Sequence, residues 1–395
     1  MEGVLNLIQQ FWKEEKRIKS LFVVDFFLYF CTFLLVPIIP IYMKDFLNFN
    51  SSQVGLTIGI PSVIGCFFGG ISYLCYKKFG SYLSILLSIC IDIIVYMFLF
   101  LKGDFYLIFL IYIFKGFSGC IFMPIFKNLY INALEKKENK VFVFKIRYIL
   151  ICTSAIFAPL VSNYLYPVSE KLIFIIVIAI NVICSFIILT KKNLINSIEV
   201  HSNSIIPLKK IILQKKYFFI FLIACIGILS VFSQFEGTFI LTLDDSIALN
   251  MFSKLLILNS ILGIIFQVFH MQFFKKISSY HSIIIGCLFF SSSYFSFFIS
   301  KNSIVSLSFS ILLFTLGETL VLPNIEIFTT EISSENERVI FYSLLEFKRL
   351  GFFLGPFLSG IILANFSPAF MFLFFSSLSI FSCCIFMYFK YKYFP

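Results

Sequence analysis

Charged residues are scarce in this chain of 395 residues: Asp, Glu, Lys and Arg make up 13% of it, whereas 60% of the residues are hydrophobic. Soluble domains are on average only about half apolar. A soluble protein of this length would have to hide a very large apolar surface with few charged side chains. The composition therefore excludes an ordinary soluble protein and favours one that lies within a lipid bilayer.

The motifs of nucleotide hydrolysis and metal catalysis are also missing from the sequence. It contains neither a G-x-x-x-x-G-K-[ST] phosphate loop nor an H-E-x-x-H zinc motif. The 11 cysteines fall in apolar runs without the spacing of a disulfide framework or a zinc site, and the three histidines form no ligand pattern. We therefore expect no enzyme, and we predict no catalytic residue, no metal site and no cofactor.

Long apolar runs, separated by short polar segments, dominate the rest of the sequence. The runs are about twenty residues long and lack the alternation of apolar and polar residues that marks a transmembrane β-strand. They predict an all-α membrane protein with twelve transmembrane helices in two pseudo-symmetric six-helix bundles. The predicted spans are 21–43, 52–75, 82–101, 105–132, 141–165, 171–190, 217–243, 249–273, 280–300, 304–330, 339–364 and 367–390.

The distribution of Lys and Arg indicates how these spans cross the membrane. Of the 31 basic residues, 20 fall in segments that would share one side, and 4 fall on the other. Basic residues mark cytoplasmic segments, and this bias explains the net charge of +11 without a nucleic-acid partner. We expect a multi-pass protein of the cell (inner) membrane with both termini cytoplasmic. No small-residue cleavage site follows the basic start, so we expect the first span to be retained.

A long basic segment divides the spans into two groups of six. The predicted organisation is an N-terminal six-helix bundle (1–190), a cytoplasmic linker (191–216) and a C-terminal six-helix bundle (217–395). The halves also resemble each other at an offset of about 198 residues, at which YKKFGSYLS (76–84) aligns with FKKISSYHS (274–282). This similarity predicts two parallel repeats related by an axis along the membrane normal.

These features together resemble the major facilitator superfamily of transporters. The segment YLCYKKFGSY (73–82) is similar to the family signature Gly-x-x-x-Asp-Arg-x-Gly-Arg-Arg, with Lys in place of Asp and Ser-Tyr in place of the last two Arg. The eleventh span carries a helix-packing motif, Gly351, Gly355, Pro356 and Gly360, similar to one that drug:proton antiporters carry on the fifth span. Small residues of this kind let helix backbones approach closely.

The resemblance implies a secondary active transporter that works by alternating access. Within the family, the antiporter branch implies proton-coupled efflux of hydrophobic or cationic compounds by a monomer, with protons as the coupling ion. Two alternatives stay open at this point: proton-coupled uptake of a sugar, nucleoside or other metabolite, and a non-transporting polytopic sensor or lipid-handling protein. Carboxylates inside the predicted spans argue against a sensor, because buried charges are expensive.

Ionisable and polar side chains inside the predicted spans mark a candidate pathway for substrate and protons. In the family, the first, fourth, seventh and tenth spans line the central cavity. Here they carry the pathway candidates Asp25, Lys115, Gln234, Glu236 and Glu318. Because burial disfavours an ionised carboxylate, Glu236 and Glu318 are expected to bind and release protons near neutral pH. Lys115 is expected to pair with a carboxylate such as Glu318 or Asp25, or to bind an anionic substrate.

Several of these residues also have structural interpretations. Asp25 lies near the end of its span, where it could reach interfacial water, and Lys115 could close a structural ion pair. Asp92, on the third span, is expected to form only a local hydrogen bond. Glu326, near a cytoplasmic end, is expected to be solvated.

Further charges fall in the cytoplasmic third of the fifth and eleventh spans. Glu346 and Arg349 are three residues apart and share a helix face. Lys348 and Arg349 can extend toward the cytoplasm. Together with Arg147 on the fifth span, they are expected to form interdomain ion pairs, either in a gate whose pairs break and re-form or in a static seam.

Overall fold

The structure is a computed structural model that describes residues 19–68, 70–132, 137–198, 216–244, 247–273, 277–300, 303–333 and 338–393. Every element within those ranges is a helix, and 11 helical spans are long and apolar enough to cross a membrane. One further apolar helix, Ser51–Phe67, has 17 residues. These helices confirm the predicted all-α membrane fold.

The described helices belong to two compact units. Unit 1 comprises Met1–Leu35 and Phe68–Asn203, and unit 2 comprises Val36–Phe67 and Ser204–Pro395. The second predicted span therefore groups with helices from the C-terminal part of the chain. The bundle boundaries at 190 and 217 follow chain order and stay a prediction.

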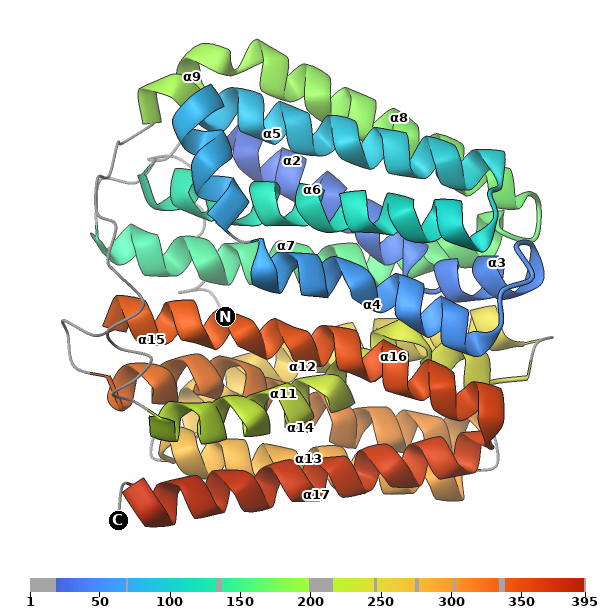
Figure 1. Cartoon of the computed structure of the whole chain (residues 1–395), viewed down its shortest axis with the longest axis vertical. Helices are drawn as coiled ribbons and strands as arrows, with labels where there is room; N and C mark the ends of the chain where they lie inside the picture. The colour runs from blue at the N-terminus through green and yellow to red at the C-terminus, as the bar shows by residue number, and fades with distance from the viewer. Residues whose placement is uncertain are drawn as a thin grey trace. The chain divides into compact units, whose positions relative to one another are not determined.

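Unit 1 contains the first group of described helices. Helix α5 packs on α6 and α8, and α2 packs on α7 and α8 (Figure 1). Its core is rich in aromatic side chains, including the fully buried Phe126 and Tyr130. The helices are α2 (Lys19–Leu35), α5 (Gly70–Leu101), α6 (Phe105–Asn132), α7 (Lys137–Leu165), α8 (Glu170–Thr190) and α9 (Lys192–Ile198).

The predicted loop between the second and third spans is wrong in one respect. Residues 76–79, expected in that loop, are helical, because α5 already begins at Gly70. The turn occurs instead at Gly80, whose φ of 73° and ψ of 175° interrupt α5. Only glycine adopts this conformation readily, so one residue is sufficient to redirect the chain.

The start of the predicted linker is also helical. Helix α9 packs on α5 and α6, and its Ile195 is fully buried in the core of unit 1. An apolar residue inside a basic segment is easily overlooked in a hydropathy profile. Residues 199–215, the rest of the predicted linker apart from Lys216, lie outside the described residues.

Unit 2 contains the remaining described helices. Helix α13 contacts α14 and α17, α11 contacts α16 and α17, α12 contacts α14, and α4 runs along α16 (Figure 1). Its helices are α3 (Ile39–Asp45), α4 (Ser51–Phe67), α11 (Lys216–Gly237), η2 (Phe239–Thr242), α12 (Ala248–Phe273), α13 (Ser279–Ile299), α14 (Ile304–Glu331), α15 (Arg338–Leu345), η3 (Glu346–Arg349), α16 (Leu350–Asn365) and α17 (Pro368–Tyr393).

Two predicted spans are interrupted. The first changes from α2 to α3 around Pro37, and α3 has Pro40 in its first turn, where the missing N–H is tolerated. The eleventh contains the 3₁₀ segment η3 between α15 and α16. Such a segment within a helix often marks a hinge, and this one carries three charged side chains.

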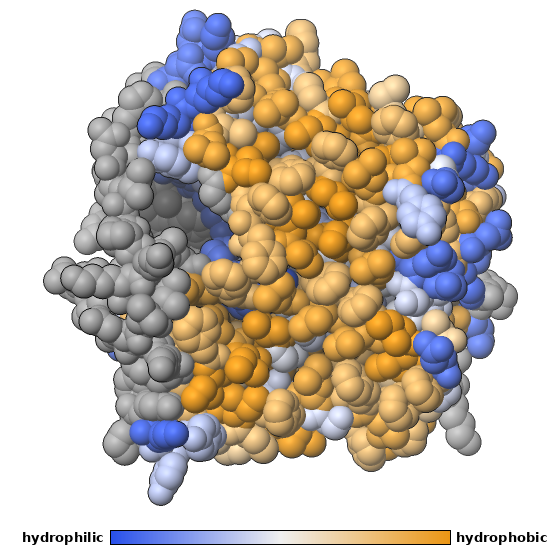
Figure 2. Space-filling view, viewed as in Figure 1, coloured by the Kyte–Doolittle hydropathy of each residue, from blue (hydrophilic) through white to orange (hydrophobic). Residues whose placement is uncertain are grey.

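The surface matches what a bilayer requires. Figure 2 shows apolar side chains covering the middle of the visible helices, with hydrophilic residues gathered toward their ends. Phe186 in unit 1 is 66% exposed and Phe381 in unit 2 is 60% exposed. Such large exposed apolar side chains on both units would be unfavourable in water and are favourable against lipid tails.

Candidate functional site

A cavity of about 190 Å³ lies within unit 1 and contains an ion pair. The ammonium group of Lys115 on α6 lies 2.8 Å from the carboxylate of Asp92 on α5. It also donates a hydrogen bond of 2.9 Å to the hydroxyl of Tyr96. The side chains of Lys115 and Asp92 are 29% and 17% exposed, so the pair remains accessible from the cavity.

The expected partners of Lys115 were wrong, and so was the local role expected for Asp92. Lys115 pairs with Asp92 rather than with Glu318 or Asp25, because α5 and α6 pack side by side. One signal was available in the sequence: Asp92 and Tyr96 are four residues apart and so share a helix face. The depth at which this face meets Lys115 depends on the packing of the two helices.

A second ion pair lies in the core of unit 1. Asp25 on α2 is 1% exposed, and its Oδ2 lies 2.7 Å from Nε of Arg147 on α7. Tyr130 donates its hydroxyl to the same carboxylate at 3.2 Å, and Arg147 donates to the hydroxyl of Tyr29 at 2.9 Å. Asp25 therefore does not reach interfacial water. Its charge is satisfied within the unit, as a buried carboxylate requires.

Two carboxylates in unit 2 have a different environment. Glu318 on α14 accepts a hydrogen bond of 3.0 Å from the amide of Asn259 on α12, and Glu236 lies at the end of α11. Both side chains are half-buried. Within the described ranges, no ion pair joins either of them to a basic side chain.

Gln234 lies apart from this pair of carboxylates. It is fully buried in the core of unit 2, where Tyr294 donates a hydrogen bond of 2.6 Å to its amide oxygen. The reason is helical geometry: two residues along a helix turn the side chain by about 200°, so Gln234 and Glu236 face opposite sides. The pathway role predicted for Gln234 has no support from this placement.

The charges of the eleventh span pair within unit 2. Arg349 lies 2.6 Å from Glu346 inside η3, which confirms that these two residues share a face. Lys348 binds Glu326 on α14, whose side chain is still 44% exposed, so the solvation expected for Glu326 holds beside this ion pair. Arg147 has its partner in unit 1. A gating or interdomain role for these four predicted residues stays a prediction.

Reversing the charge of the pair between η3 and α14 provides a test of this arrangement. Lys348→Glu should lower the free energy of unfolding by about 1 kcal/mol, because it places two carboxylates together at a partly exposed site. The double variant Lys348→Glu/Glu326→Lys should recover most of the loss in thermal unfolding of the detergent-purified protein. As a matched control, reversing Glu346 and Arg349 together should have a smaller effect, since that pair is local. A double variant no more stable than Lys348→Glu would contradict the pairing.

The small residues of the eleventh span bring α16 close to α11. A methyl group added at Gly351 would lie 2.6 Å from the carbonyl oxygen of Ile226, a distance that real side chains do not adopt. A methyl group at Gly355 would meet the carbonyl oxygen of Ser230. Both glycines therefore hold the backbones of the two helices in direct contact, as predicted for small residues between membrane helices.

The rest of the same motif faces α4. A methyl group at Gly360 would overlap the carbonyl oxygen of Ser51, and one at Gly55 would overlap the carbonyl oxygen of Pro356. The Cα of each glycine would lie 3.1 Å from the methyl group added at the other. One motif on α16 thus packs against two helices.

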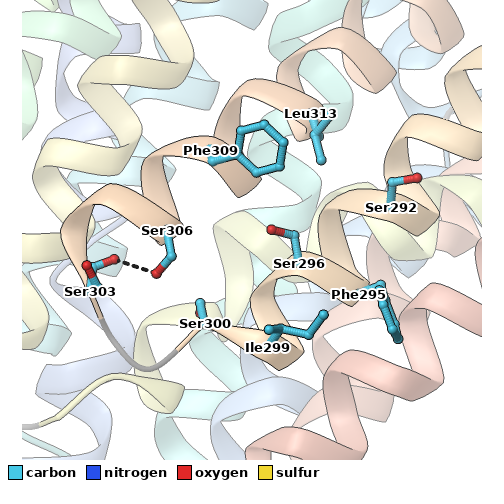
Figure 3. Close-up of a pocket in the computed structure, with 9 residues that line it drawn as sticks. All are labelled: Ser292, Phe295, Ser296, Ile299, Ser300, Ser303, Ser306, Phe309 and Leu313. Carbon is cyan, nitrogen blue, oxygen red and sulfur yellow. Dashed lines mark hydrogen bonds between the residues drawn. The ribbon is translucent and has the colours of Figure 1, made fainter.

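A larger pocket lies between the C-terminal turns of α13 and the N-terminal turns of α14. Its volume is about 600 Å³, and it is lined mainly by serine hydroxyls and exposed apolar side chains (Figure 3). Ser306 donates a hydrogen bond of 2.9 Å to the carbonyl oxygen of Ser303 at its edge. None of its lining residues is titratable, so it is a weaker candidate for transport chemistry than the two charged sites. In the described part of the chain, no group of three His, Cys, Asp or Glu could hold a metal ion.

Comparison with known proteins agrees with this architecture. Residues 21–347 match the sequence model of the Major Facilitator Superfamily. An uncharacterized MFS-type transporter of Bacillus subtilis (strain 168), YqjV, is 25% identical over 339 residues, which are 82% of this chain and 81% of that protein.

Solved structures are similar over nearly the whole chain. The nucleoside transporter NupG matches with a TM-score of 0.80 at 15% identity and covers 95% of this chain and 99% of its own. An auto-inhibited peptide transporter of the POT family matches with a TM-score of 0.77 at 14% identity, over 96% and 98% of the two chains. At such identities the likeness establishes the fold and not the substrate.

Proposed function

Because the chain belongs to the major facilitator superfamily and is a multi-pass membrane transporter of small molecules, we propose that it exports hydrophobic or cationic compounds in exchange for protons. Transport would proceed by alternating access in the cell (inner) membrane, with the protein monomeric and both termini cytoplasmic. The orientation rests on the distribution of Lys and Arg, and the export direction rests on the antiporter-like motif of the eleventh span.

The observation that carries the proposal is the pair of carboxylates in unit 2. Glu236 and Glu318 are half-buried, and no ion pair to a basic side chain satisfies them within the described residues. An uncompensated carboxylate in an apolar setting is unfavourable, so it favours either a bound proton or a cationic group of a substrate. These two ligands exclude each other at the same oxygens, and such competition is the basis of exchange.

Purified protein in proteoliposomes can distinguish exchange from co-transport. In an antiporter, the substrate moves against the proton flow, so vesicles with an acidic lumen should accumulate a cationic dye whichever way the protein is inserted. In a symporter, vesicles in an acidic medium would instead accumulate the substrate. Testing cationic dyes beside sugars and nucleosides also covers the alternative of metabolite uptake.

We expect Glu236→Gln and Glu318→Gln each to reduce gradient-driven dye accumulation to the level of protein-free vesicles. The matched control is Glu331→Gln on the same helix as Glu318, because Glu331 accepts a hydrogen bond from Ser279 at the helix end. This control should retain transport. Gradient-driven flux that survives in both variants would overturn the assignment of the proton site, and accumulation only from an acidic medium would overturn antiport.

A further inference from the structure

The cavity of unit 1 contains a buried acceptor that no described group satisfies. Asn181 on α8 lines this cavity and is 1% exposed. Its amide nitrogen donates a hydrogen bond of 2.8 Å to the carbonyl oxygen of Val177, but its Oδ1 has no hydrogen-bond partner. Leaving a buried acceptor unpaired is unfavourable, and a native protein usually provides such an atom with a donor. Asn181 is a wall residue of this cavity, so a ligand that carries a donor is one way to satisfy its Oδ1.

The same cavity offers a cationic donor and a balanced set of charges. An ammonium group has three N–H donors: Lys115 donates one to Tyr96, and its Nζ lies 2.8 Å from Oδ1 of Asp92, an oxygen that accepts no hydrogen bond from the described residues. Among the residues that line the cavity, Lys115 is the one cation and Asp92 is the one carboxylate. A ligand with a net charge would leave one charge uncompensated in a partly desolvated site. The site therefore favours a ligand whose own charges sum to zero.

We propose that this cavity binds a small zwitterion of the chemical class of the α-amino acids. Its ammonium group would donate to Oδ1 of Asn181 and pair with Asp92, and its carboxylate would accept from Lys115. Hydrogen bonds in which at least one partner is charged are the strong ones, and the bond to Oδ1 of Asn181 would satisfy an acceptor that the described protein leaves unpaired. Apolar neighbours such as Leu28 and Phe122 would contact a short side chain, and a volume of about 190 Å³ excludes large ligands.

This site is separate from the carboxylates assigned to proton binding. Those lie in unit 2 and carry no basic partner among the described residues, whereas the unit 1 cavity contains a complete ion pair. The inference therefore does not rest on proton coupling, and binding is measured without any gradient. Glu236→Gln should leave zwitterion binding unchanged even if it abolishes dye transport.

Calorimetric titration of the protein in lipid nanodiscs tests the ligand class. Glycine, alanine, valine and leucine sample the side-chain size, and saturable binding of at least one of them is expected. Two analogues of the best binder, one lacking the carboxylate and one lacking the ammonium group, should bind about tenfold more weakly or worse, because each loses one charge-assisted hydrogen bond. Analogues that bind as well as the zwitterion, or no saturable binding in the series, would overturn the proposal.

Variants at the acceptor link the binding to this cavity. Asn181→Leu keeps the branched shape of the side chain but removes Oδ1, and it should weaken zwitterion binding about tenfold. The control is Asn324→Leu, since Asn324 is equally buried in unit 2 and its amide likewise donates a hydrogen bond of 2.8 Å to the carbonyl four residues earlier. Asn181→Asp adds a negative charge and should shift the preference toward the amine analogue, a change that a structural role would not produce. Equal effects of the two Leu variants, or an unchanged preference in Asn181→Asp, would contradict the site.

Discussion

Replacing Arg147 with methionine is expected to lower the free energy of unfolding by about 3–5 kcal/mol, because it leaves a buried carboxylate without its cation. Asp25 is 1% exposed and has no access to water that could replace the lost partner. Methionine keeps much of the length of the arginine stem, so the loss reports the charge more than the packing. Chemical unfolding of the detergent-purified protein, followed by circular dichroism, measures the change.

The double variant Asp25→Asn/Arg147→Met distinguishes a missing charge from a packing defect. Removing both charges should recover most of the loss, since the amide introduced in place of Asp25 would keep a hydrogen-bond acceptor for Tyr130. The control is Lys102→Met, because Lys102 and Glu170 lie 3.8 Å apart with 41% and 21% of their side chains exposed. Such a pair is worth less than about 1 kcal/mol. A double variant as unstable as Arg147→Met alone would show that the ion pair is not the cause.

The sequence was sufficient to predict most helices because the bilayer requires a strong contrast in hydropathy between the spans and the polar segments that join them. The predicted span 105–132 coincides with α6, and both polar ends of that helix are clear in the sequence. The prediction is wrong where the break is conformational rather than compositional. The turn at Gly80 lies in a run that stays helical on both sides, and no hydropathy average reveals a single residue with positive φ.

For the candidate sites, the sequence predicts pairs within one helix but not pairs between helices. Glu346 and Arg349 could be paired from the sequence because three residues along a helix fix their relative position. Lys115 could not be assigned to Asp92, because the partner depends on which helices pack together and at what depth. The sequence thus predicted which positions carry charge, and the fold determined which of them compensate each other.

Adding one methyl group at Gly55 is expected to be among the most damaging small changes in unit 2. The new group would overlap the carbonyl oxygen of Pro356 and lie 3.1 Å from the Cα of Gly360, both parts of a backbone that cannot rotate away. Helices α4 and α16 would have to separate, and overpacking of this kind costs about 1–3 kcal/mol. Gly119→Ala on α6 is the control, because a methyl group there meets nothing within 4 Å and alanine favours a helix over glycine by about 1 kcal/mol. Thermal unfolding should therefore move in opposite directions for the two substitutions. If Gly55→Ala were as harmless as Gly119→Ala, the direct backbone contact between α4 and α16 would be refuted.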